Sequence, residues 1–333
     1  MALVGGAAAR EESFLKSIKI ACALALVAGA SVNVFAQSFP AKPIRLVVAY
    51  PPGGATDILA RAITPKAGEL LGQQIIIENQ GGAGGKIGAQ TVARAAPDGY
   101  TMLLNVVGSH ILTLFDKEAL NHPIKEFTPI THAVESVLCI AASVATGPKS
   151  MADLVDFAKK NPGKLAYGTT GSETMLAMEQ IALLNNTKML FIPYKGGAQA
   201  TTDMLSGSVP LVLQPVVTFL PHVKSGKARI LAVMLPKRWE DMPDVPTIQE
   251  AVPGFEKAPG GIGIWGPGGL PSAIATRLQV ALAAGLKQSE IAERLKSQGM
   301  IPIGNTPAEF SKEINDGVVI NARLVKASGV EIH

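Results

Sequence analysis

Apolar, strand-like runs, each followed by a glycine-rich turn and a helix-like segment, recur along most of this chain. The first block has strands near residues 44–50, 74–78 and 100–105, and the helix before the last strand covers about 86–96. A strand that passes through a helix into another strand of the same sheet returns parallel to the first. This order therefore predicts a parallel sheet with helices on its faces.

A second block repeats the same order. Its expected strands lie near residues 136–142, 164–168, 189–193, 209–213 and 228–235. Helices separate most of these strands, and the first of them begins at Ser150 with a residue pattern like a capping box. Two blocks of one pattern predict an α/β protein with two lobes, each a mixed, mostly parallel sheet flanked by helices.

The remaining residues contain one expected strand near 261–265 and then mainly helices, the last opened by a capping box at Thr306. A helical tail cannot build a third α/β domain, so we expect it to pack back on one sheet. Prolines at 243, 246, 253 and 259 mark the crossover that leads into it. The expected division is residues 37–136 and 259–333 for lobe 1, and 137–258 for lobe 2.

The composition fits such a protein. A length of 333 residues favours about two domains, and 47% apolar with 17% charged residues is typical of a globular chain. The formal net charge is only +4, and the lysines and arginines are scattered. This distribution argues against a nucleic-acid partner.

The N-terminus has the pattern of a secretory signal peptide. Basic residues precede an apolar run that begins at Ile20, and small residues follow up to Ala36, where we expect cleavage. An uncleaved membrane anchor is the alternative, but the run is short and is broken by Ser31 and Asn33. We therefore expect residues 1–36 to be removed and the rest to be exported to the periplasm as a monomer.

Cleavage would leave one cysteine, Cys139. A single thiol forms no internal disulfide, so a core of ordinary size has to hold the fold together. Cys139 lies within an apolar run, which predicts a buried structural side chain and not a nucleophile.

Two of the strand-to-helix turns are rich in glycine and contain no lysine or arginine. Main-chain N–H groups that converge at such a turn, together with the partial positive charge of the helix start, can bind an anion. Ordinary connections can also have this composition, but the pattern occurs once in each block. The expected ligand-binding residues in the two turns are Pro52, Gly53, Gly54, Ala55, Thr56, Asp57, Thr169, Thr170, Gly171, Ser172 and Thr174.

The energies indicate that one turn is not enough. Removing a carboxylate from water costs several kcal/mol, and each hydrogen bond to a charged acceptor returns about 1.5–3 kcal/mol. Micromolar binding needs about 8 kcal/mol net. Both lobes would then have to contribute, and closure of the lobes would depend on the ligand.

A third turn adds Tyr194 and Lys195 to the candidates. Lys195 stands near an expected helix start, where the macrodipole disfavours a cation. It is either a solvated lysine or a partner for a second carboxylate of the ligand.

The sequence contains no motif for phosphate binding, metal binding or nucleophilic catalysis. The glycine run at residues 80–88 lacks the first glycine and the hydroxyl residue of a phosphate-binding loop, so we interpret it as a structural turn. The five histidines show no metal-ligand spacing, there is no nucleophile elbow, and Ser109 beside His110 is a hydroxyl next to an imidazole, although neighbours in sequence rarely face one another. Asp57 and Asp98 are expected in caps or turns. We expect no catalytic residue, metal or cofactor.

The chain resembles the Bug family, also called TctC-like, of periplasmic solute-binding receptors of tripartite tricarboxylate transporters. The resemblance covers essentially the whole chain after residue 36. Its motifs are YPPGGATD at residues 50–57, ENQGGAGG at 78–85, APDGYT at 96–101, PYKGG at 193–197, LAV at 231–233 followed by Lys237 and Arg238, and PDVPT at 243–247.

The resemblance implies a two-lobed venus-flytrap fold of the periplasmic binding protein type, with a carboxylate held between the loops at residues 52–57 and 169–174. It also implies the membrane permease subunits of a tripartite transporter as partners, and neither catalysis nor a metal. Alternatively, a receptor of this family can sense a ligand as the partner of a membrane histidine kinase. A secreted α/β hydrolase or isomerase is a third interpretation, from another class.

The sequence departs from the family pattern in the second loop, which is shorter than usual and has no histidine after it. Glu173 in this loop would repel a second acidic group unless it points away or pairs with an amino group. Gln214 and Pro215 stand where a segment with aspartate is common. The ligand therefore stays open between a di- or tricarboxylate, an amino acid, an amide and an aromatic acid.

Overall fold

The computed structural model describes residues 39–117, 119, 122–194 and 196–332. The expected signal peptide and Lys195 lie outside the described residues. Residues Lys42–His333 form one compact unit, to which all the described helices and strands belong. Among the described residues, no helix combines the length and the apolar character that a membrane crossing requires.

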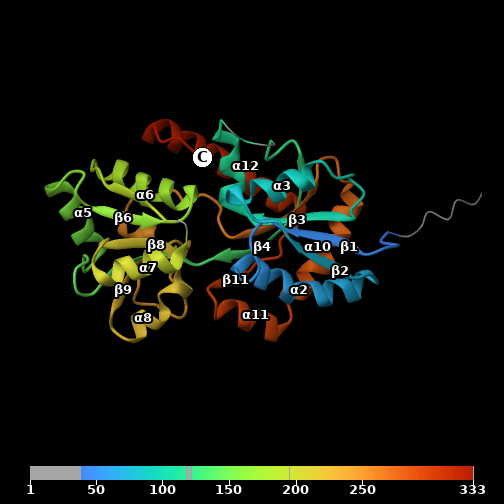
Figure 1. The fold of residues 1–333 in the computed structure, drawn as a ribbon, viewed down its shortest axis with the longest axis horizontal. Coiled ribbons are helices and arrows are strands. Elements are labelled where there is room, and N and C mark those ends of the chain that lie inside the picture. Colours follow the sequence, from blue (N-terminus) through green and yellow to red (C-terminus); the bar gives the residue numbers. More distant parts are fainter. Residues whose placement is uncertain (1–38, 118, 120–121, 195, 333) are drawn as a thin grey trace, which may run out of the picture. The chain divides into compact units, whose positions relative to one another are not determined.

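The first sheet has six strands in the order β11-β4-β10-β3-β1-β2 (Figure 1). β1 pairs in parallel with β2 and β3, whereas β10 runs antiparallel to β3 and β4, and β11 runs antiparallel to β4. The bounds of these strands are β1 Ile44–Val48, β2 Ile75–Asn79, β3 Thr101–Val106, β4 Phe127–Ser136, β10 Ile262–Pro267 and β11 Met300–Pro302.

Two of these strands correct the sequence analysis. β4 and β11 were not predicted, whereas β10 is the expected strand near residues 261–265. The sheet is mixed, as expected, but it is not mostly parallel, because β10, β4 and β11 run antiparallel to their neighbours. β4 lacks a clean apolar alternation because it buries two polar residues, Thr131 and His132. Both residues donate hydrogen bonds to Asn305, and the His132 ring also contacts the Glu313 carboxylate. β11 is too short for its pattern to be recognised.

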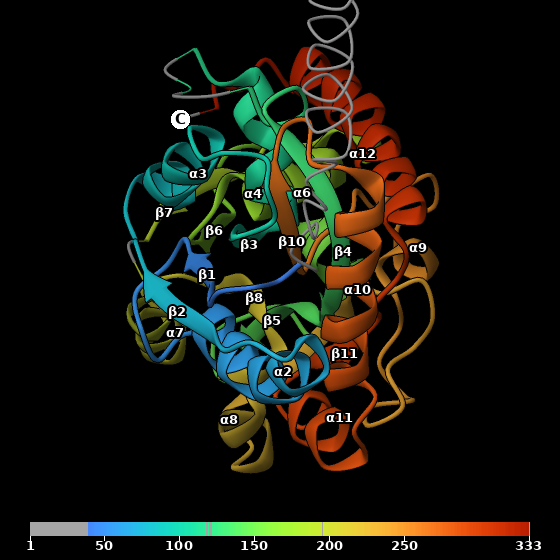
Figure 2. The ribbon, with the colours of Figure 1, turned by 90° about the vertical axis from the view of Figure 1, so that its right-hand side faces the viewer.

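Helices cover both faces of the first sheet (Figures 1 and 2). α2 and α10 pack against each other on one face, and α3 and α12 lie on the other. The expected capping box at Thr306 is confirmed, since its side chain and that of Glu309 bond each other's main-chain N–H groups. The bounds are α2 Ala55–Leu71, α3 Lys86–Ala93, α4 Val107–Leu112, α10 Ser272–Leu286, α11 Ser289–Lys296 and α12 Pro307–Ser328.

The second sheet has five strands in the order β7-β6-β8-β5-β9. β6 is parallel to β7 and β8, and β5 is antiparallel to β8 and β9. The strands are β5 Leu138–Ser143, β6 Ala166–Thr169, β7 Leu190–Pro193, β8 Leu211–Pro215 and β9 Ala228–Val233. The helices are α5 Met151–Lys160, α6 Ser172–Leu184, α7 Gly197–Ser206, α8 Leu220–Lys224 and α9 Ile248–Ala251.

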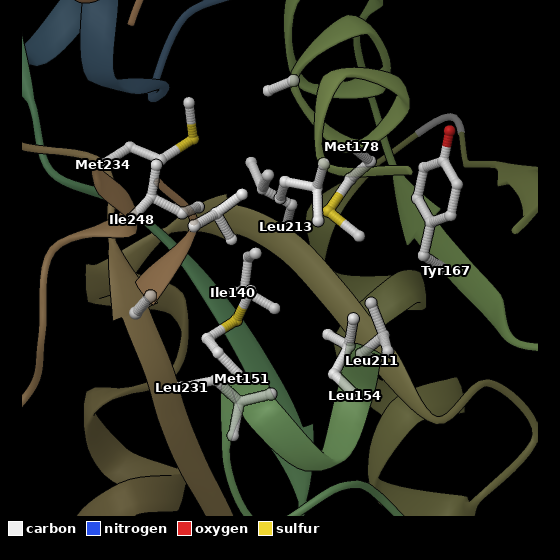
Figure 3. Close-up of a cluster of buried hydrophobic side chains, with 14 of the residues drawn as sticks. Ile140, Met151, Leu154, Tyr167, Met178, Leu211, Leu213, Leu231, Met234 and Ile248 are labelled. Carbon is white, nitrogen blue, oxygen red and sulfur yellow. The ribbon is translucent and has the colours of Figure 1, made fainter. Parts of the chain in front are cut away.

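The alternation of side chains along a strand explains how this second sheet is covered on both faces. Ile140, Leu211 and Leu213 point into the cluster that α5, α6 and α9 close, which Figure 3 shows. Their neighbours Cys139 and Val212 point to the opposite face, against α7 and α8. Cys139 is a buried free thiol, as predicted, and burial raises its pKa.

Two segments of chain connect the sheets. The first runs from β4 to β5 through Val137, and the second runs from residue 256 to Gly261 and enters β10. An ion pair joins them, with Lys257 Nζ 3.0 Å from Glu135 Oε2. The sheets are thus separate in their hydrogen bonding but tied at these crossings, and the exact lobe boundaries at residues 136 and 259 stay a prediction.

The close approach of α2 and α10 gives a test of this packing. A Cβ on Gly285 of α10 would lie only 2.7 Å from the main-chain oxygen of Ile63 in α2, so Gly285→Ala must push the helices apart. We expect it to lower the free energy of unfolding by about 1–3 kcal/mol in urea titrations. Val280→Ala on the exposed side of the same helix is the control, and an equal effect from both variants would contradict this account.

Candidate functional site

A cavity of about 1030 Å³ is lined by residues of both sheets. Its walls come from the segments that follow β1, β3, β6, β7 and β8, where each strand ends and a helix begins. The carboxyl ends of the parallel strands, β1 and β3 in the first sheet and β6, β7 and β8 in the second, collect helix starts at one edge, because each crossover leaves the sheet on that side. Two such edges line one cavity, which is the arrangement that the two glycine-rich turns predicted.

The first predicted turn lies on the wall. Pro52, Gly54, Ala55 and Thr56 line the cavity, and Gly54 precedes the first residue of α2 in extended conformation. Gly53 does not line it; its φ of 85° makes the turn, a conformation that glycine adopts without strain. The first-turn N–H groups of α2 have no acceptor within the helix, so they are available to a ligand.

Asp57 is not on the wall but fixes the turn from behind. It is buried, and its carboxylate accepts hydrogen bonds from Gly53 N at 3.0 Å, Arg61 Nε at 2.9 Å and Asn79 Nδ2 at 3.1 Å. The bond from Arg61 is the largest cause that lowers the pKa of Asp57 to about 2, and the bonds from Gly53 and Asn79 act in the same direction against burial. Asp57 therefore positions the loop.

The second predicted turn also lines the cavity. All five of its candidate residues lie on the wall: Thr169, Thr170, Gly171, Ser172 and Thr174. The hydroxyl of Thr174 donates to Gly171 O at 2.8 Å, and Thr169 Oγ1 in turn hydrogen-bonds Thr174 Oγ1. Thr169 is 1% exposed. The Thr169 hydroxyl is thus engaged within the loop, and the Ser172 hydroxyl and the first-turn N–H groups of α6 are left for a ligand.

The third turn contributes Tyr194 to the wall, while Lys195 lies outside the described residues. The Tyr194 hydroxyl donates to Asp203 Oδ2 at 2.9 Å, and burial, followed by Asp203, raises its pKa to about 12. The phenol therefore points to α7.

Gln214, which the sequence showed only as a departure from the family, lies beside this turn. Its side chain is 1% exposed, and neither amide atom has a hydrogen-bond partner in the described part of the chain. A Cβ on Gly197 would lie 2.6 Å from its Oε1, so the amide packs against the start of α7. Gln214 lines the cavity, and its amide group carries two N–H donors and an acceptor oxygen that are buried without partners among the described residues.

The segment after β2 also lines the cavity, which the sequence pattern did not predict. The glycine run at residues 80–88 is a turn and helix entry, as predicted, but Ala83 and Gly84 of its short 3₁₀ helix Ala83–Gly85, together with Lys86, also line the cavity. Lys86 forms an ion pair with Asp116, and the two side chains are 14% and 1% exposed. The signal was present, since this run too is a glycine-rich entry from a strand into a helix.

The adjacent hydroxyl and imidazole do not form a catalytic pair. Ser109 lines the cavity, but the ring of His110 is buried between Phe127 and Trp265. His110 Nε2 lies 3.0 Å from Pro123 O, so this nitrogen carries the proton, and burial lowers the pKa of the ring to about 4. Nor do three or more His, Cys, Asp or Glu side chains converge as a metal site within the described residues.

The family model of the tripartite tricarboxylate transporter family receptor, TctC, matches residues 59–330. The chain belongs to this family. The resemblance stated from the sequence motifs is confirmed.

Solved structures agree. The periplasmic binding protein BugD is 33% identical, with a TM-score of 0.74 over 89% of this chain and 100% of its own. R. palustris Rpa4515 with adipate is 30% identical, with a TM-score of 0.77 over the same shares of 89% and 100%. MatC from Rhodopseudomonas palustris with bound malate is 28% identical, with a TM-score of 0.73 over 87% and 100%. This TctC protein thus has the predicted periplasmic-binding-protein fold.

The buried carboxylate behind the first loop gives a prediction. Its pKa is lowered in the folded protein, so Asp57 stabilises the fold above the ordinary aspartate pKa of about 3.9, and this contribution is lost as the pH falls towards 2. We expect Asp57→Asn to lower the free energy of unfolding by about 1–3 kcal/mol at pH 7.

The deficit should shrink between pH 4 and pH 2, which urea titrations at several pH values would measure. Asp156→Asn, exposed on α5, is the control. A deficit that does not change with pH would show that the charge of Asp57 is not what holds the loop.

Proposed function

We propose that this TctC protein is an extracytoplasmic receptor that captures a small carboxylate in the cavity and presents it to the permease of a tripartite transporter. One observation carries the proposal: the starts of α2 and α6, from different sheets, line one cavity. Each start offers main-chain N–H groups without an intrahelical acceptor, together with the positive end of a helix dipole.

The binding energy fits a ligand held from both sides. Two or three hydrogen bonds from one loop return about as much as the desolvation of a carboxylate costs. Only the sum of both loops leaves the roughly 8 kcal/mol that micromolar affinity needs. The ligand would therefore favour the closed arrangement of the lobes, because only that arrangement brings both sets of donors to it.

The relatives support the ligand class. The structure of Rpa4515 contains adipate and that of MatC contains malate, and both molecules carry carboxylates. The family is one of transporter receptors, and BugD is described as periplasmic. We extend these properties to this chain as proposals: periplasmic location after removal of residues 1–36, delivery to a membrane permease, function as a monomer, and binding without turnover.

Native mass spectrometry of the purified protein, followed by isothermal titration calorimetry, tests the ligand class. We expect a retained small molecule that carries at least one carboxylate, released on denaturation, unchanged in mass and rebound at micromolar concentration or below. A retained ligand without any carboxylate would contradict the proposal, and so would chemical conversion of the ligand during incubation.

Gly54→Val tests the first loop. A Cβ at this position would meet nothing nearer than Pro51 O at 3.8 Å, and φ is −82°, so the fold tolerates a side chain. The added methyl groups would cover the helix start and raise the dissociation constant at least about tenfold, the equivalent of one lost charged hydrogen bond. Ala273→Val, in the exposed first turn of α10, is the matched control. An unchanged dissociation constant in Gly54→Val would remove this loop from the site.

A further inference from the structure

Glu173 is a carboxylate on the cavity wall that the fold leaves without a partner. It is the second residue of α6, and within the described part of the chain no hydrogen bond or ion pair reaches its oxygens. Its side chain extends towards α4, because a Cβ on Gly108 would collide with the carboxylate. α4 and α6 pack against each other, and Figure 2 shows the two helices together.

Among the described residues, Glu173 and the charged groups next to it contain one cation fewer than anions. Behind it lie Glu135 and Lys257, whose ion pair measures 3.0 Å. Lys257 is thus already engaged, and Glu135 Oε1 is buried without a hydrogen-bond partner in the described residues. Two carboxylates share one ammonium group in this corner.

Within the described residues, which do not include Lys195, two further ion pairs border these cavities. Arg323 pairs with Glu256, which borders the small cavity behind Glu173, and Lys86 pairs with Asp116 on the wall of the main cavity. Neither pair offers a spare positive charge to Glu173.

Burial and the excess of negative charge in this corner raise the pKa of the Glu173 carboxyl group. Burial, then repulsion from Glu135, raises its pKa to about 7, while the attraction of Lys257 works in the other direction. The carboxyl group therefore takes up a proton nearer to neutral pH than an ordinary glutamate does.

Tyr50 and Ser109 complete the corner from the first sheet. Tyr50 and Glu173 line the same cavity, and burial, followed by the charge of Glu173, raises the pKa of the Tyr50 phenol. The phenol donates to Gly84 O at 3.3 Å, and its oxygen can still accept a hydrogen bond. Glu173 and Tyr50 therefore bring acceptor oxygens to the cavity wall from opposite sheets.

We propose that Glu173, with the Tyr50 phenol oxygen, binds an ammonium group of the ligand and so makes this receptor selective for α-amino acids over plain carboxylic acids. The proposal rests on the proposed function, because the carboxylate of the same molecule occupies the helix starts. Gly171, Ser172 and Glu173 are consecutive in the chain, so the N–H donors and the acceptor lie within one turn. An α-amino acid carries its carboxylate and its ammonium group on one carbon, which matches this proximity.

The opposite assignment predicts a different pH dependence. If protonated Glu173 donated a hydrogen bond to a second carboxylate of the ligand, binding would tighten as the pH falls below 7. An ammonium ligand requires the ionised carboxylate, so a proton competes with it and binding weakens as the pH falls from 8 to 6. Binding near pH 7 would then release a proton, and the calorimetric enthalpy would depend on the ionisation enthalpy of the buffer.

The experiment compares matched acids that differ only in the ammonium group: L-glutamate with glutarate, L-norleucine with hexanoate, and L-phenylalanine with 3-phenylpropanoate. In the tightest-binding pair at pH 8, we expect the amino acid to bind at least about tenfold more tightly, as for one charged hydrogen bond. Glu173→Gln should reduce this ratio to less than about threefold and abolish both the pH dependence and the proton release.

Glu290→Gln is the matched control, since Glu290 is likewise the second residue of a helix that begins with serine and is exposed away from the cavity. Tight binding of the plain acids, unaffected by Glu173→Gln, would overturn the ammonium site but leave the carboxylate receptor standing. If no carboxylate binds, and none is retained on purification, both proposals are overturned.

Discussion

Unpaired main-chain N–H groups at two helix starts are the feature on which the rest of this structure depends. The first turn of a helix always leaves such donors, and a protein has to supply water, a side chain or a ligand to them. Here α2 and α6 direct theirs to one cavity from two sheets, and no basic side chain belongs to either turn. The loops are held in shape by their own contacts, as in the hydrogen bonds that Asp57 accepts behind the first turn.

This division of labour explains why so many polar side chains near the cavity are not free for a ligand. The Thr169 and Thr174 hydroxyls bond each other, and the Tyr194 hydroxyl bonds Asp203. Such contacts fix the main chain and so lower the entropy cost of binding. In the part of the chain that the structure describes, Gln214 and Glu173 line the cavity without hydrogen-bond partners, and such groups can provide selectivity.

Much of the fold and about half of the cavity wall were accessible from sequence. Strands such as β1 are short apolar runs, and the turns after them carry the glycines that a tight entry into a helix needs. β4 escaped prediction because it buries polar residues whose partners lie far away along the chain, such as Asn305. The cavity wall at Lys86 was not predicted, because its glycine run does not match a phosphate-binding loop and was interpreted as a structural turn.

The sequence by itself determined the local elements, the family, and the two turns able to bind an anion, since these follow from periodicity and from the conformational freedom of glycine. Only the tertiary structure decided that β10 enters the first sheet between β3 and β4, and that both turns share one cavity with Glu173. The physical reason is that hydrogen bonds between strands, and the environment of a buried charge, depend on residues far apart in the chain. Local pattern carries no record of those distances.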